Sequence, residues 1–422
     1  MGTYLRDTTL AHSFQSFVRR MKILLLNQAF YPDAAATAQY LSELATVLVE
    51  RGHQVTVVTG QRAYDEPVKL FPAQETWRGV RIFRVFSTYF GKQSKWRRVA
   101  DFASFIFFCC ARLVFLPRHD VVVALTTPPL ISFIGAWCGK LWGAKFCYWV
   151  MDFNPDEAIA AGWLRADSFA GRMLERMSRF SLRRADWIIA LDRFMRDRIV
   201  AKGIVAEKIA VIPPWSQDND VRFDTTGREQ FRAAHNFTDK FVVMYSGNHS
   251  PVHLLDTLMQ AAEQLKDDAS IRFCFVGGGS EFKRVKRWAE EGKRNNVLCL
   301  AYQPLNQLSA SLSSADAHVV VMGNAFVGLV HPCKIYNILA IGAPVLYIGP
   351  QPSHVTEILD CSGGKHPWVY IQHGEVAVLV HAIQKLGQNT IGCARLLPVE
   401  ITAGFSKVVL LSQLVAGLEK LA

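Results

Sequence analysis

The sequence predicts an α/β protein of two doubly wound domains that face one another across a ligand-binding cleft. The chain has 422 residues, and because one hydrophobic core stops growing at about 250–300 residues, two domains are expected. Short apolar runs, typical of buried parallel strands, alternate with amphipathic helical patterns in both halves of the chain. Two successive sheets of this kind turn the ends of their strands toward a shared cleft.

The first structural unit is expected to begin with a strand at residues 22–26. A helix with apolar residues at helical spacing follows at residues 38–51, and Gly52 ends it before a strand at residues 55–58. Ligands bind beyond the carboxyl ends of strands in open α/β sheets. The loop before the helix is therefore expected to line the cleft through its small residues Ala35, Ala36 and Thr37.

A membrane-binding surface is predicted next. A basic, aromatic loop at residues 89–98 follows a strand at residues 80–86 and precedes a very apolar helix at residues 99–116. Aromatic rings suit the headgroup region of a bilayer and cations suit anionic lipid. The alternative is a solvated loop before a core helix. The residues predicted to contact the membrane or the acceptor are Trp96, Arg97 and Arg98.

Four more strands are expected in the first half, at residues 120–125, 145–150, 187–191 and 209–212. Asp152 follows the second of them, at the carboxyl edge of the sheet, where a catalytic or acceptor-binding carboxylate belongs. The alternative is an aspartate that caps the next helix. The domain boundary is expected in the polar segment at residues 213–224. We interpret its Asp218-Asn219-Asp220 as a solvated linker rather than a metal site.

The second half repeats the pattern, with strands expected at residues 241–245, 271–276, 296–300, 317–322, 345–348 and 369–371. The first two strands lead into glycine-containing loops, and glycine lets a ligand approach the backbone closely. The residues of interest in these loops are Gly247, Asn248, His249, Gly277 and Gly278.

The segment at residues 322–350 predicts a loop, a short helix and a buried strand. The helix is expected to begin near residues 332–333 and to end at Gly342. A helix start offers free N–H groups and a positive dipole end, which suits a phosphate. His331 and Lys334 are placed to add donors or charge. The alternative is an ordinary crossover helix of an α/β domain.

The composition narrows the choice of partners. The net charge of +11 indicates an anionic partner, which nucleic acid, anionic lipid or a phosphorylated substrate would satisfy. The nine cysteines include no C-x-x-C pair, which argues against a disulfide framework or a zinc site and fits a reducing compartment. Residues 1–20 lack the apolar core of a signal peptide and are expected to be a disordered extension. No apolar segment reaches the roughly 20 uninterrupted residues of a spanning helix.

The order and spacing of these motifs resemble the GT-B glycosyltransferases of family 4, in particular their exopolysaccharide and O-antigen branch. The resemblance rests on the segments at residues 21–60, 122–130, 148–162, 211–215, 241–250, 273–281 and 331–349. It implies two Rossmann-like domains and a retaining transfer from a nucleotide-diphosphate sugar, without a metal or other cofactor. It also implies a last helix that crosses back to the first domain. The acceptor-side domain then comprises residues 21–212 and 400–422, and the nucleotide-sugar domain comprises residues 213–399.

The resemblance also assigns roles in the cleft. The two family glutamates that contact the donor sugar and the ribose are replaced by Leu329 and Asn337. Asn337 can still hydrogen-bond a ribose hydroxyl. It shares the ribose and base site with Gly277, Gly278 and Tyr302. The diphosphate and sugar site is assigned to Gly247, Asn248, His249, His331, Cys333 and Lys334. Lys334 is expected to stabilise the leaving diphosphate, and Asp152 to orient or deprotonate the acceptor.

The predicted function is transfer of a sugar to a lipid-linked or saccharide acceptor in surface polysaccharide biosynthesis. The enzyme is expected to be cytoplasmic and peripheral on the inner face of the cytoplasmic membrane. One alternative is a nucleotide-sugar epimerase or hydrolase on the same architecture. Another is a non-catalytic, membrane-peripheral partner of a polysaccharide assembly complex, motivated by the missing glutamates. Nucleic acid is not an expected partner, because no recognised reader motif appears.

Overall fold

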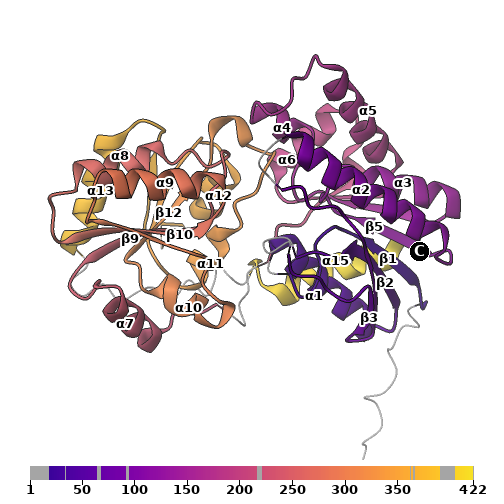
Figure 1. The fold of residues 1–422 in the computed structure, drawn as a ribbon, viewed down its shortest axis with the longest axis horizontal. Coiled ribbons are helices and arrows are strands. Elements are labelled where there is room, and N and C mark those ends of the chain that lie inside the picture. The colour runs from indigo at the N-terminus through magenta and orange to yellow at the C-terminus, as the bar shows by residue number, and fades with distance from the viewer. Residues whose placement is uncertain are drawn as a thin grey trace, which may run out of the picture.

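The computed structural model describes residues 19–33, 35–63, 68–91, 95–215, 221–361, 363–364, 366–389 and 404–421. It contains two β-sheets, each covered by helices, that lie side by side (Figure 1). The predicted α/β class with two doubly wound domains is confirmed. Most of the predicted extension at residues 1–20 lies outside the described residues, as do Asp218, Asn219 and Asp220.

The first sheet has eight strands in the order β3-β4-β2-β1-β5-β6-β7-β8. They are β1 (Lys22–Leu26), β2 (Gln54–Gly60), β3 (Gln74–Trp77), β4 (Val80–Val85), β5 (Val121–Ala124), β6 (Lys145–Trp149), β7 (Trp187–Ala190) and β8 (Ile209–Val211). Neighbouring strands pair in parallel except β3, which runs antiparallel to β4 at one edge. Ile23 of β1 pairs with Val55 of β2 and Val121 of β5. Strand order therefore reverses at β1, where ligand crevices form in such sheets.

The helices of the first domain cover both faces of its sheet (Figure 1). They are α1 (Ala36–Glu50), α2 (Lys95–Val114), α3 (Ile131–Trp142), α4 (Asp156–Ala160), α5 (Phe169–Arg184), α6 (Arg193–Ala201) and the 3-10 helix η1 (Ala206–Lys208). Helix α2 corrects one expectation. Trp96, Arg97 and Arg98 lie in its first turn instead of a loop, because no glycine or proline separates them from the apolar helix. Among the described residues, no helix combines the length and hydropathy needed to cross a bilayer.

The second sheet has six parallel strands in the order β11-β10-β9-β12-β13-β14. They are β9 (Phe241–Asn248), β10 (Ile271–Gly278), β11 (Val297–Leu300), β12 (Ala317–Val321), β13 (Val345–Ile348) and β14 (Trp368–Ile371). The helical segments are α7 (Thr225–Ala234), α8 (Asp256–Gln264), α9 (Ser280–Glu291), α10 (Leu305–Ser313), η2 (Asn324–Phe326), α11 (Lys334–Ala340), α12 (His354–Asp360) and α13 (Val376–Asn389). Order reverses between β9 and β12, so the second crevice lies at the ends of these strands.

The glycines that follow the first two apolar runs of this domain end strands and are not in loops. Gly277 of β10 pairs with Gly247 of β9, and both have positive φ, at 137° and 130°. A Cβ atom added to Gly277 would overlap the carbonyl oxygen of Gly247. Only glycine therefore fits this approach, and the two strands end in a surface of bare backbone.

The chain returns to the first domain at its end. Helix α15 (Lys407–Leu421) packs against α1 beside the first sheet (Figure 1). The ammonium of Lys407 lies 2.7 Å from Glu43 Oε1, and His53 Nε2 lies 3.2 Å from Glu419 Oε1. The helix predicted at residues 400–422 is thus observed from Lys407 to Leu421, against the first domain.

Candidate active site

The ammonium group of Lys334 is the central feature of the second domain's crevice. Lys334 begins α11, and its Nζ atom lies 3.5 Å from the centroid of the Tyr245 ring. Among the described residues, this buried nitrogen has no hydrogen-bond partner. Burial lowers the pKa of Lys334 to about 7. Burying an ammonium group without a hydrogen-bond partner costs free energy, even beside an aromatic ring. An anionic ligand would supply the missing partner.

Two histidines near this ammonium, His249 and His253, are neutral. Burial, with the charge of Lys334 as the next cause, lowers the pKa of His249 to about 4 and that of His253 to about 3. His249 Nδ1 lies 2.9 Å from the carbonyl oxygen of Gly247, and His253 Nδ1 lies 2.8 Å from that of Val321. A carbonyl only accepts, so Nδ1 donates in both rings. His249 therefore lines the predicted diphosphate site without adding charge to it.

Two glycine-containing strand ends and an aromatic ring lie at the same edge of the second sheet. A Cβ atom added to Gly247 would lie 3.4 Å from Lys334 Nζ, so the strand end directly faces the ammonium. A Cβ atom added to Gly278 would lie 2.9 Å from the Tyr302 ring, which places that ring over the end of β10. Asn337 lies one helical turn after Lys334 and is half-buried. Gly247, Lys334 and His249 thus lie close together at this edge of the sheet, and Asn248 ends β9.

Asp152 lies on the other side of the cleft, after β6 of the first domain. Its backbone N–H donates to Thr126 Oγ1 at 3.3 Å. Burial raises the pKa of the Asp152 carboxyl, and burial together with the charge of Asp152 raises the pKa of Glu157. The two carboxyls therefore form a pair that holds a proton more readily than ordinary acids. Glu157 was not predicted as a site residue, because its position relative to Asp152 depends on the turn between them.

Cys333 connects the two sides. It precedes Lys334, and its thiol lies 3.2 Å from the carbonyl oxygen of His331. Burial, followed by the charge of Asp152, raises the pKa of the Cys333 thiol to about 12. Cys333 is therefore a protonated thiol at the start of α11, and it has no character of a nucleophile.

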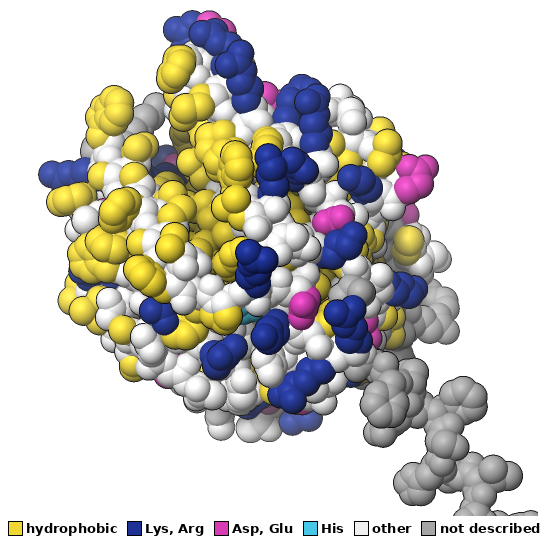
Figure 2. All heavy atoms as spheres, turned by 90° about the vertical axis from the view of Figure 1, so that its right-hand side faces the viewer, with side chains coloured by type: hydrophobic (Ala, Val, Ile, Leu, Met, Phe, Trp, Pro, Cys, Tyr) yellow, Lys and Arg dark blue, Asp and Glu magenta, His cyan; other side chains and the backbone are white. Residues whose placement is uncertain are grey.

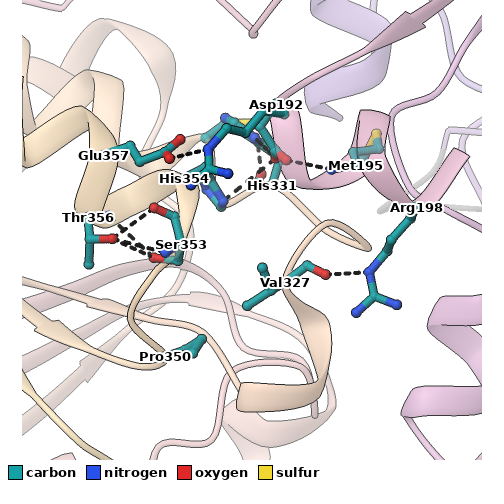
Figure 3. A network of polar contacts seen from close by, with 12 residues as sticks. Asp192, Met195, Arg198, Val327, His331, Pro350, Ser353, His354, Thr356 and Glu357 are labelled. Carbon is teal, nitrogen blue, oxygen red and sulfur yellow. Dashed lines mark hydrogen bonds and ion pairs between the residues drawn. The ribbon is translucent and has the colours of Figure 1, made fainter. Parts of the chain in front are cut away.

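The structure corrects the assignment of His331 to the diphosphate site. His331 Nδ1 lies 2.8 Å from Asp192 Oδ2, and Nε2 lies 2.7 Å from the Tyr336 hydroxyl. Both ring nitrogens are thus already hydrogen-bonded, and His331 lies beside Asp192 and His354 (Figure 3). Asp192 was not predicted as a site residue, although its place directly after an apolar strand run was a usable signal.

Asp192, His331 and His354 also have the ligand types of a metal site. Their ligand atoms lie within 4.8 Å of one another, and no other such group occurs among the described residues. However, the two imidazole rings stack at 3.9 Å with an interplanar angle of 22°. The lone pairs of imidazole nitrogens lie in the ring plane, so stacked rings do not direct them to one point. The geometry fits a hydrogen-bonded cluster better than a metal centre.

The predicted first-loop residues lie where the domains approach each other. Ala35 caps α1, and Ala36 and Thr37 form its first turn, so they belong to the helix and not to the preceding loop. A hollow of about 1300 Å³ lies beside this turn, between the two domains. Its lining includes Tyr31, Asp33, Glu43, Arg222 and Asn306. None of the predicted donor residues lines this hollow, which we regard as the outer part of the interdomain cleft.

Leu329 is buried, and its carbonyl oxygen accepts the backbone N–H of Phe153 at 2.8 Å. The position of the first family glutamate is thus occupied by an apolar side chain at the contact between the domains. The residue joins the segment before α11 to the segment that carries Asp152.

Two Rossmann-like domains that lie side by side are the architecture of the GT-B glycosyltransferases. Residues 36–215 match the family described as "Glycosyl transferase 4-like domain", and residues 227–359 match "Glycosyl transferases group 1". The chain belongs to the GT-B glycosyltransferases of family 4, as the motifs predicted, and it is an enzyme of the glycosyltransferase type.

Relatives with similar sequences come from bacterial polysaccharide biosynthesis. The chain is 27% identical over 342 residues to the putative colanic acid biosynthesis glycosyl transferase WcaI of Escherichia coli K12, covering 76% of this chain and 82% of that protein. It is 25% identical over 246 residues to the probable glycosyltransferase WbjE of Pseudomonas aeruginosa, covering 58% and 61%.

Solved structures share the fold. HepE of Anabaena in complex with UDP-glucose superimposes with a TM-score of 0.70 at 17% identity, covering 95% of this chain and 100% of that one. WaaG, a glycosyltransferase involved in lipopolysaccharide biosynthesis, gives a TM-score of 0.62 at 16% identity, covering 91% and 100%. These likenesses concern the architecture.

Proposed function

We propose that this protein is a retaining glycosyltransferase that moves a sugar from a nucleotide-diphosphate sugar to a lipid-linked or saccharide acceptor in surface polysaccharide biosynthesis. The observation that carries the donor class is the buried, unpaired ammonium of Lys334 facing the bare backbone of Gly247. A diphosphate is the part of such a donor that fits a cation beside exposed backbone. The UDP-glucose bound by HepE and the colanic acid role named for WcaI support the same class.

In the proposed reaction the bond between the sugar's anomeric carbon and the diphosphate oxygen breaks. Negative charge then grows on the leaving diphosphate, and the Lys334 ammonium stabilises it. The acceptor hydroxyl attacks the same carbon from the face that the diphosphate leaves, which retains the anomeric configuration. Asp152 accepts a hydrogen bond from that hydroxyl, orients it and takes its proton.

The residues of the crevice divide the donor between them. Tyr302 offers a ring face beside Gly278 to the nucleoside base, and Asn337 offers an amide to a ribose hydroxyl. A neutral Asn337 accepts and donates, where a glutamate would only accept. We therefore propose that the ribose is held less firmly here than in members with both glutamates.

Calorimetric titration with a panel of nucleotide-diphosphate sugars tests this proposal. One donor should bind in the micromolar range, and the NMR spectrum of the transfer product should show the anomeric configuration of the donor. An inverted product would contradict the retaining mechanism. Sugar release or epimerisation without acceptor would favour the epimerase or hydrolase alternative. No binding of any nucleotide-sugar would favour a non-catalytic partner.

We also propose that the first domain binds an anionic membrane surface, which would place a cytoplasmic enzyme peripherally on that membrane. Apolar side chains gather on the outer face of this domain, with Lys and Arg around them (Figure 2). On α2, Trp96 is 82% exposed and Phe107 is 67% exposed, and Phe169 at the start of α5 is 78% exposed. Arg176, Arg179, Arg183 and Arg184 line a neighbouring basic hollow on α5. Exposed aromatics beside cations suit an anionic bilayer.

The double variant Trp96→Ser/Phe107→Ser should lose membrane binding, because it removes apolar area from the surface without touching the cleft. Flotation with vesicles of phosphatidylglycerol and phosphatidylcholine should show wild-type binding to the anionic vesicles. The bound fraction should fall by about tenfold in the variant. Leu254→Ser, at an exposed position of the second domain, is the matched control. Equal binding of the double variant and the wild type would contradict the proposed surface.

A further inference from the structure

A buried chain of hydrogen-bonded side chains joins Asp192 of the first domain to His331 of the second (Figure 3). Asp192 belongs to the first domain, at the end of β7. His331 precedes α11, and Tyr336 lies within it. His331 Nδ1 is 2.8 Å from Asp192 Oδ2, and Nε2 is 2.7 Å from the Tyr336 hydroxyl. A carboxylate only accepts, so Nδ1 donates to it, and Nε2 forms the hydrogen bond with the tyrosine hydroxyl.

The Asp192 end of this chain is fixed in the first domain. Its other carboxylate oxygen accepts the backbone N–H of Met195 at 2.8 Å and caps α6. Burial opposes ionisation of Asp192, but the hydrogen bond from His331 favours the carboxylate, and the pKa of the carboxyl is lowered to about 2. Asp192 is therefore a charged acceptor held by the start of a helix.

His354 fixes the plane of the His331 ring. The two rings stack at 3.9 Å, and burial keeps the pKa of His354 well below its usual value. Among the described residues, His354 has no hydrogen-bond partner for either ring nitrogen. It thus acts as a flat, uncharged neighbour, and His331 has one ring orientation that satisfies both Asp192 and Tyr336.

The first domain also contacts residues 327–331, the segment that directly precedes α11. Leu329 accepts from Phe153, the residue after Asp152, at 2.8 Å. The guanidinium Nε of Arg198 donates to the Val327 carbonyl oxygen at 2.6 Å. Residues 327–331 are therefore held by the first domain immediately before α11 delivers Lys334 to the donor crevice.

We propose that Asp192, His331 and Tyr336 form a positioning chain that aligns α11, and hence Lys334, with Asp152 when the domains are in contact. This inference rests on the proposed function. Lys334 and Asn337 lie on the same helix as Tyr336, so a shift of the helix at Tyr336 would move both. The donor crevice is built by the second domain alone. Loss of the positioning chain should therefore slow the transfer step, which needs both domains, more than it weakens donor binding.

The variants Tyr336→Phe and Asp192→Asn test this chain, because each removes one hydrogen-bonding group and keeps the side chain's shape. Loss of one such bond should lower kcat by about threefold to tenfold. The donor Kd, measured by calorimetry without acceptor, should change by less than about twofold. The double variant should lose no more than the worse single variant, because both changes act through His331.

The control variant is Glu357→Gln, which breaks the half-exposed ion pair of Glu357 with Arg193 in the same contact region and should leave kcat unchanged. Additive losses in the double variant, or a loss of donor affinity as large as the loss of kcat, would overturn the positioning chain. One equivalent of zinc in the purified wild type would also overturn it. Wild-type protein that transfers no sugar would instead overturn the proposed function, and this inference with it.

Discussion

Lys334→Met should lower turnover by about 10²–10³-fold, the effect typical of removing one preorganised group that stabilises charge in a transition state. Methionine fills most of the space that the lysine stem occupies, so the crevice keeps its packing. The loss should appear in kcat at saturating acceptor and also as weaker donor binding. Steady-state kinetics with the donor identified by titration provide the measurement.

The same variant should be at least as stable as the wild type. The folded-state pKa of Lys334 is lowered to about 7 by burial, whereas that of an unfolded lysine is about 10.4. Between these values the unfolded chain binds more protons, so the wild type gains stability as the pH rises from about 7 to 10. Lys334→Met should lack this gain and should melt no lower than the wild type near pH 7. Lys283→Ala, on the exposed surface of α9, is the matched control for both measurements.

Donor binding should be linked to proton uptake at the same residue. A bound diphosphate favours the charged ammonium and raises the pKa of Lys334. Affinity should therefore be nearly constant below about pH 7, where the free protein is already charged, and should fall as the pH rises above that value. Calorimetry in buffers of different ionisation enthalpy would measure the number of protons taken up when the donor binds. Near-normal turnover of Lys334→Met, or a Kd independent of pH from 6 to 9, would reject this role.

Much of this cleft was predictable because its residues follow strand ends. Asp152 and Lys334 could be placed from the apolar runs before them and the helix pattern after them, since parallel strands end at one edge of a sheet. The edge strand β3 was not predictable in this way. Its sequence, Gln-Glu-Thr-Trp, is half-exposed and contains no apolar run. The start of α2 was also placed too late, because aromatic and basic residues read equally well as a loop.

The direction of a side chain was the harder part. His331 lies three residues before Lys334 in the chain, which suggested a shared ligand. Its ring instead bonds Asp192, which is 139 residues away, and no local pattern encodes such a pairing. Similarly, Glu157 was recognisable as a residue that favours the start of α4. The effect of the Asp152 charge on the pKa of Glu157 arises from the turn between them, in which the Glu157 N–H donates to the Phe153 carbonyl oxygen.

Asp152→Asn should reduce turnover by about 10²–10³-fold, because the amide cannot take the proton of the acceptor hydroxyl. Asparagine has nearly the same shape and retains one acceptor oxygen, so the acceptor still fits. Donor binding should be nearly unchanged, within about threefold, since Asp152 belongs to the first domain and the donor crevice to the second. Asp152→Asn should therefore lower turnover but not donor affinity, whereas Lys334→Met should lower both.

The pH profile supplies a second readout for Asp152. Burial raises the pKa of its carboxyl, so kcat of the wild type should fall as the pH drops through a value above the usual aspartate range of about 4. Asp152→Asn should have low activity without this acidic limb. The variant should also be no less stable, because it removes a buried charge that burial disfavours and that raises the pKa of the neighbouring Glu157. Glu157→Gln keeps the Asp152 carboxylate and should retain most of the turnover. A wild-type acidic limb that persists in Asp152→Asn would assign the proton transfer to another group.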